Sequence, residues 1–183
     1  MNHGLCSSGR SAVLALVLAA GCVSLHLDVT FAPGSIDMRS HGTTVLQEPA
    51  QRPVHVGDGG TDADSIPAEY RLAHPSHGRG WRVVVDRPPG AAELEATIES
   101  LAPVDNPWGC YAEAVLNDRP VGRLQAPRGA AAGAVSVVKV LLPAGALQVG
   151  ENRLAIVQRE CAVTRDQDRF DDALIRSVLL RVP

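Results

Sequence analysis

Apolar and polar residues alternate in short runs along the chain after Gly80. These runs are rich in Val, Leu and Ile, and turn-forming residues separate them at intervals of roughly ten residues, which is typical of an all-β sandwich or barrel. We expect strands over residues 81–86, 93–101, 111–116, 121–124, 134–142, 153–158 and 174–182. The sequence therefore predicts an all-β chain that folds into an antiparallel β-sandwich.

The apolar residues of the second segment, 93–101, fit both the period of a helix and that of a strand. A helical stripe would consist of Ala91, Leu94, Ile98 and Leu101. From Glu93 to Glu99, however, polar residues alternate strictly with apolar ones, as they do in a half-buried strand. We prefer the strand.

Aromatic residues are scarce in this chain, which has two each of Trp, Tyr and Phe. The core must therefore be built largely from Val, Leu, Ile and Ala, a composition that favours strands wherever Val clusters. We expect Trp81, which opens a Val-rich strand, to lie in that core.

The segment before the sandwich has a different amino-acid composition. Residues 23–68 contain several prolines, and residues 57–65 are mostly Gly and Asp, so we expect a flexible tether. One stretch, residues 25–31, alternates apolar and polar side chains and is predicted to add to an edge of the domain or to pair with a partner. The expected organisation is a signal peptide over 1–21, a lipidated N-terminus and tether over 22–68, and a β-sandwich domain over 69–183.

The N-terminus has the pattern of a secretory signal. Arg10 precedes an apolar run of about ten residues, which is too short to cross a membrane. The Ala-Ala-Gly-Cys sequence at 19–22 resembles the lipobox of bacterial lipoproteins, although Ala19 stands where the pattern prefers Leu. The resemblance implies cleavage before Cys22, diacylation of its thiol and anchoring in the cell envelope. No Asp follows Cys22, so it further implies the outer membrane. An ordinary cleavage site with a chance cysteine is the alternative.

The remaining cysteines and the net charge limit the possible partners. Cys6 leaves with the signal and Cys22 is the expected lipid attachment site, so Cys110 and Cys161 are predicted to form a disulfide in an oxidising compartment. A metal site or a catalytic thiol is less well supported, because neither cysteine has ligands or catalytic partners nearby in the sequence. The formal net charge of −3 argues against nucleic-acid binding.

Three segments carry a second resemblance. The sequence at 112–122, the Leu-Leu-Pro at 141–143 and the Gly-Glu-Asn turn within 147–156 look like those of galactose-binding-domain-like jelly rolls. Asp118 stands where that family usually has Gly after Asn. The resemblance implies a jelly-roll β-sandwich that binds a glycan or a protein partner rather than one that catalyses a reaction.

Two loops carry candidate ligand residues. Trp108 could stack on a sugar, with Asn106 and Tyr111 beside it; the alternative is that Trp108 packs over the disulfide as part of the core, as large aromatic side chains mostly do. A second loop is rich in carboxylates, which could hold a structural calcium ion, but Arg165 and Arg169 would partly neutralise it, and a solvated acidic loop is the alternative. The candidate calcium ligands are Asp166, Asp168 and Asp171.

Catalytic motifs are weak in this sequence. Ser136 and Lys139 match a Ser-x-x-Lys pattern, but positions three apart in a strand point to opposite faces. His74 and His77 fit a surface loop better than a zinc site. We therefore expect a non-catalytic cell-envelope lipoprotein without a cofactor. The alternatives are a scaffold subunit that docks by strand addition through residues 25–31 or through an exposed sheet edge, and a hydrolase that uses a carboxylate such as Asp168 or Asp172.

Overall fold

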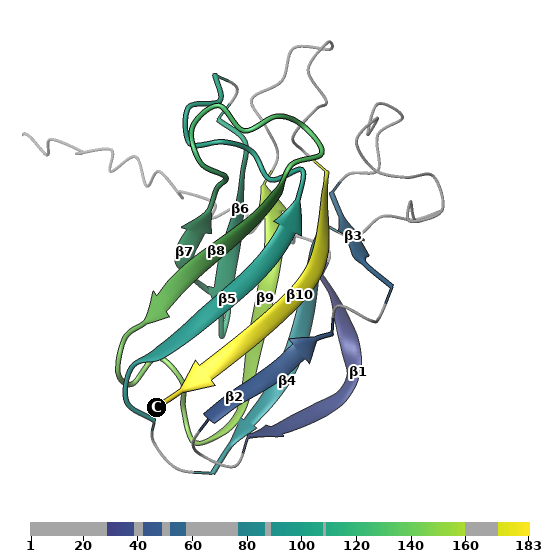
Figure 1. The fold of residues 1–183 in the computed structure, drawn as a ribbon. Helices are drawn as coiled ribbons and strands as arrows, with labels where there is room; N and C mark the ends of the chain where they lie inside the picture. The colour runs from purple at the N-terminus through teal and green to yellow at the C-terminus, as the bar shows by residue number, and fades with distance from the viewer. Residues whose placement is uncertain are drawn as a thin grey trace, which may run out of the picture.

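The computed structural model describes residues 29–38, 42–48, 52–57, 77–86, 89–107, 109–159 and 172–183 of the chain. These residues form ten strands in two layers that face each other (Figure 1). The strands are β1 (Val29–Met38), β2 (Gly42–Gln47), β3 (Val54–Val56), β4 (Gly78–Val85), β5 (Ala92–Glu99), β6 (Tyr111–Leu116), β7 (Arg119–Leu124), β8 (Val135–Leu142), β9 (Gly150–Arg159) and β10 (Ala173–Val182).

The two sheets have different strand orders. The first sheet runs β1-β4-β9-β6-β7, and the second runs β2-β10-β5-β8, with β3 pairing with the first residues of β10. Neighbouring strands are antiparallel except β1 and β4, which are parallel. The predicted all-β antiparallel sandwich is confirmed, with one parallel pair at the edge of the first sheet.

The strands expected after Gly80 correspond to β4 through β10, with ends that differ by a few residues. The segment that fitted two periods is strand β5. Leu94 and Ile98 on its inner face are completely buried, whereas Glu93 and Glu95 on its outer face are partly exposed. The alternation of burial excludes the helix.

The expected flexible tether is wrong over much of its length. Strands β1, β2 and β3 lie within residues 22–68 and belong to the sandwich, so its described part begins at Val29 rather than near residue 69. Met38, Leu46 and Val56 from these strands are buried in the core. Edge strands are held by backbone hydrogen bonds and a few apolar anchors, which explains why their composition resembles that of a loop.

Strand β1 is anchored by Phe31. A Cβ atom on Gly80 would lie 2.6 Å from the Phe31 ring, so glycine at this position allows the ring to lie against β4. The guanidinium carbons of Arg82 and Arg153 lie 5.2 and 4.8 Å from the ring centroid. Cation–π attraction therefore adds to the pairing of β1 with β4. Residues 29–31 of the expected docking strand are thus paired within their own chain.

The core between the sheets is aliphatic, as the composition predicted, and Trp81 is completely buried in it. A hydrogen bond joins the β6–β7 turn to the turn that precedes β9. Asn117 and Asp118 adopt φ values of 50° and 64°, as the central residues of a type I′ hairpin do, so Asp118 occupies a position usually given to glycine. The Asn117 Nδ2 group donates to Oδ1 of Asn152 at 3.0 Å, which links the β6–β7 turn to the start of β9.

Candidate functional site

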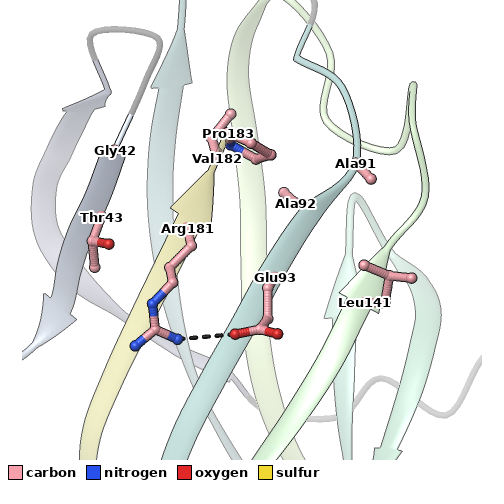
Figure 2. A pocket seen from close by; sticks show the side chains of 9 residues that line it. All are labelled: Gly42, Thr43, Ala91, Ala92, Glu93, Leu141, Arg181, Val182 and Pro183. Atoms are coloured by element: carbon pink, nitrogen blue, oxygen red, sulfur yellow. Dashed lines mark hydrogen bonds and ion pairs between the residues drawn. The ribbon is translucent and has the colours of Figure 1, made fainter.

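A pocket of about 550 Å³ opens at one end of the second sheet, where β8 and β10 end and β2 and β5 begin (Figure 2). Its lining is mostly apolar, with one carboxylate and one guanidinium. The lining residues are Gly42, Thr43, Ala91, Ala92, Glu93, Leu141, Arg181, Val182 and Pro183.

Strand register places the pocket residues. Arg181 of β10 pairs with Thr43 of β2 on one side and with Glu93 of β5 on the other, and Glu93 pairs with Leu141 of β8. These four residues therefore form one row across four strands, and Figure 2 shows them projecting on the same side. Because side chains repeat every second residue along a strand, the next row on this face contains Glu95 and its partner Lys139.

The two rows are connected by a charged network of Glu93, Glu95, Lys139 and Arg181. One oxygen of Glu93 accepts from Lys139 Nζ at 3.0 Å and from Arg181 Nη1 at 3.0 Å. One oxygen of Glu95 accepts from the same Arg181 nitrogen at 2.7 Å and lies 3.3 Å from Lys139 Nζ. The two cations and two carboxylates thus hold one another across β8, β5 and β10.

These contacts change the ionisation of the network. Hydrogen bonding to Lys139 holds the pKa of Glu93 below its ordinary value, and hydrogen bonding to Arg181 does the same for Glu95. In return, the hydrogen bond to Glu93 raises the pKa of Lys139, and the hydrogen bond to Glu95 raises that of Arg181. All four side chains therefore carry their charges at neutral pH.

The pocket combines polar and apolar chemistry. Glu93 presents carboxylate oxygens that accept hydrogen bonds, and Arg181 presents nitrogens that donate them. Leu141, which is 70% exposed, and Val182 and Pro183 supply apolar surface around this pair. Such a site can hold a ligand that has both hydroxyl groups and a C–H face.

Sequence reasoning did not select the pocket residues. Glu93 and Glu95 were recognisable as outward residues of a strand, but the partners of Glu93 are 46 and 88 residues away in the chain, and Arg181 is 86 residues from Glu95. Only the register of three strands brings these residues together. The alternation of charge along β5 was the one available signal.

The loop that the sequence selected lies at the opposite end of the sandwich, before β6 (Figure 1). Asn106 Nδ2 donates to the backbone oxygens of Pro103 at 2.7 Å and Cys110 at 2.9 Å, and its Oδ1 accepts from the Cys110 backbone N–H. The Tyr111 ring has the Arg123 guanidinium 4.2 Å from its centroid. The amide of Asn106 thus holds the loop. Trp108 lies outside the described residues, and a ligand role for this loop stays a prediction.

The candidate calcium ligands Asp166, Asp168 and Asp171 also lie outside the described residues. Within the residues that are described, no group of three or more His, Cys, Asp or Glu side chains could hold a metal ion. Asp172 is buried instead, with its Oδ1 2.6 Å from His55 Nε2. This buried pair joins β3 to the start of β10.

Two further predictions depend on residues outside the described part of the chain. Cys110 is completely buried, but Cys161 is not among the described residues, so their pairing stays a prediction. Cys22 is likewise not described. Across the described ranges, we find no helix with the length and apolar character needed to cross a bilayer.

Comparison with protein-family models gives no match, and comparison with curated proteins gives none either. Solved structures do match. A family 35 carbohydrate-binding module from an environmental isolate is 17% identical, with 76% of this chain and 92% of the module covered at a TM-score of 0.42. A CBM36 module in complex with calcium and xylotriose is 10% identical. That match covers 76% of this chain and 99% of the module, at a TM-score of 0.38.

A GH26-CBM35 β-(1,4)-mannanase from Podospora anserina is 14% identical at a TM-score of 0.41. The match covers 78% of this chain, which spans 28% of the length of the mannanase. Because these identities and TM-scores are low, the ligand has to be inferred from the residues of this chain.

Proposed function

We propose that this chain is a non-catalytic cell-envelope lipoprotein, anchored through Cys22, whose β-sandwich binds a glycan in the pocket at the end of the second sheet. The observation that carries the proposed glycan binding is the pocket itself. A volume of about 550 Å³ with an apolar lining and few polar groups is typical of a small-molecule site.

The chemistry of the pocket suits a saccharide unit. Sugar hydroxyls both donate and accept hydrogen bonds, so a carboxylate beside a guanidinium can engage two neighbouring hydroxyls. Glu93 and Arg181 are held 3.0 Å apart by their own ion pair, which fixes the spacing of these groups before a ligand arrives. The apolar surface of Leu141 and Pro183 can contact the C–H face of a sugar ring.

The first test is thermal unfolding of the purified protein with a panel of envelope polysaccharides, each with and without calcium. A ligand that binds only the folded state raises the unfolding midpoint. We expect at least one neutral polysaccharide to raise it. Glu93→Gln should weaken binding of that polysaccharide about tenfold or more, because a hydrogen bond to a charged group is worth about 1.5–3 kcal/mol.

Two variants serve as comparisons for Glu93→Gln. Glu151→Gln removes a half-exposed carboxylate from the first sheet and should leave binding unchanged. Trp108→Ala tests the loop at the opposite end of the sandwich. If Trp108→Ala abolishes the shift and Glu93→Gln does not, the loop is the site and the pocket is not. A panel in which no polysaccharide moves the midpoint would refute glycan binding.

A further inference from the structure

The pocket is longer across the strands than along them (Figure 2). Its lining begins at Gly42 and Thr43 on β2 and ends at Leu141 on β8, with β10 and β5 between them. Neighbouring strands lie about 4.8 Å apart, so the distance from β2 to β8 is about 14 Å. Along β5 and β10, the lining covers only residues 91–93 and 181–183, which corresponds to about 7 Å. The long axis of the pocket therefore runs across the sheet.

Both ends of this long axis are open to solvent. Leu141 at the β8 end is 70% exposed, and Thr43 at the β2 end is exposed as well. In the middle, the side chains of Arg181 and Glu93 are each 36% exposed. A ligand is thus held most closely at the centre of the row, and it can continue past either end.

The centre of the row keeps hydrogen-bonding capacity after its own ion pairs are made. Lys139 and Arg181 both donate to one oxygen of Glu93, Oε1. Arg181 uses one nitrogen, Nη1, for its bonds to Glu93 and Glu95. Within the described residues, the second oxygen of Glu93 and the remaining guanidinium N–H groups of Arg181 are therefore left for a ligand.

We propose that the pocket binds an internal segment of an unbranched, neutral polysaccharide, whose chain crosses the strands from β2 to β8 over about three sugar units. This inference rests on the glycan binding proposed above and adds the length and direction of the bound segment. One pyranose ring lengthens an extended glycan by nearly the spacing of two strands, so successive rings can lie over successive strands. Arg181 and Glu93 then bind hydroxyls of the central ring, whereas Thr43 and Leu141 contact its two neighbours.

The row that follows along the strands argues against the other direction. The next outward residues of β5 and β8 are Glu95 and Lys139, and neither of them lines the pocket. Their charged groups lie 3.3 Å apart. A glycan that ran along the strands would cover this ion pair and remove water from it, and burying charges is costly. A chain that crosses the strands leaves the pair in solvent.

The test is isothermal titration calorimetry of the full chain with oligosaccharides of one to six units, prepared from the polysaccharide that raises the unfolding midpoint. The dissociation constant should fall with each added unit up to about three and change little beyond that length. The intact polysaccharide should bind several copies of the protein per chain. Internal segments recur along a polysaccharide, whereas each kind of chain end occurs once in an unbranched chain.

Substitutions at the two ends of the row test the direction of the bound chain. Leu141→Ala and Thr43→Val should each weaken binding of the three-unit oligosaccharide about threefold or more, because each removes a contact with an outer ring. Val137→Ala is the matched control and should leave binding unchanged. Val137 lies on the same strand and face as Leu141 and is 62% exposed, but it is two rows away from the pocket. Equal unfolding midpoints for the three variants would show that the fold is intact.

The outcomes distinguish this inference from the proposed glycan binding. A panel in which no polysaccharide binds refutes both. If a single sugar binds as tightly as three units, or if each polysaccharide chain binds one copy of the protein, glycan binding stands and the internal segment is refuted. Weakening by Val137→Ala, with no effect of Leu141→Ala or Thr43→Val, would place the chain along the strands and overturn the direction proposed here.

Discussion

Asn152 shows how one side chain can join two turns. It is completely buried. Its Oδ1 accepts from the backbone N–H of Gln148 at 2.8 Å, and its Nδ2 donates to the backbone oxygens of Gln148 at 2.7 Å and Gly150 at 3.1 Å. Its Oδ1 also accepts from Asn117, whose own Oδ1 accepts from the Arg153 backbone at 2.9 Å. Both turns could be predicted from their residue types, but the bonds between them could not, because they depend on the packing of β6 beside β9.

Asn152→Ala should lower the free energy of unfolding by about 2–4 kcal/mol, because it removes the four hydrogen bonds that this completely buried side chain makes to Asn117, Gln148 and Gly150. Denaturant unfolding measures this difference. Gln148→Ala is the control, since Gln148 enters the network through its backbone and its side chain is exposed. If the two variants were equally stable, Asn152 would not be the residue that holds the turns.

At the scale of elements, the sequence predicted the strands with strong alternation and missed those without it. Strand β5 was recognisable because Leu94, Ala96 and Ile98 face the core while charged residues face outward. Strand β1 was only partly expected, because Pro33 and Gly34 interrupt its pattern. Its place in the sheet depends on pairing with β4 and on the contact of Phe31 with Gly80, which are not local properties of the sequence.

The charged network on β5, β8 and β10 makes a prediction about ionisation. Lys139→Gln should raise the pKa of Glu93 more than that of Glu95, because the hydrogen bond to Lys139 is the largest cause of the lowered pKa of Glu93. Arg181→Gln should act mainly on Glu95. The pKa of each glutamate is measured from the pH dependence of the NMR signal of its carboxylate carbon in the two variants. Equal shifts at both carboxylates in both variants would contradict the assigned pairing.

The sign of the pH effect follows from these shifts. A lowered pKa in the folded state means that Glu93 stabilises the fold above the pKa it has when unfolded, which is about 4.3, and that this contribution is lost as the pH falls through the folded value. Because the network is exposed to solvent, the effect on stability is small. Glycan binding should weaken over the same acidic range, since a protonated Glu93 loses its charge-assisted hydrogen bonds.

At the scale of the whole molecule, the sequence predicted the sandwich correctly, and its candidate ligand residues lie at the end opposite the pocket that we propose as the glycan site. Residues near Trp108 were selected because they are close together in the chain. The pocket instead combines residues from 42 to 183 and exists only when four strands pair in one register. Strand pattern can be read locally, whereas a row of side chains across a sheet requires the register of every strand in it.

The position where the domain begins gives the last prediction. A chain of residues 29–183 should fold, whereas residues 69–183, the domain expected from composition, should not. The shorter chain lacks Met38, Leu46 and Val56, and burial of each such side chain is worth about 1.5–3 kcal/mol. Their combined loss, with the pairing of β1 to β4 and of β2 and β3 to β10, is comparable to the total stability of a small domain, about 5–15 kcal/mol.

Near-ultraviolet circular dichroism and thermal unfolding of the two chains provide the measurement. The longer chain should give a fixed signal from the buried Trp81 and one cooperative transition, and the shorter chain should give neither. If residues 69–183 unfolded cooperatively at the midpoint of the longer chain, the first three strands would be an accessory to the sandwich. We expect them to be part of it, because β10 is central in its sheet only when β2 and β3 lie along its outer side.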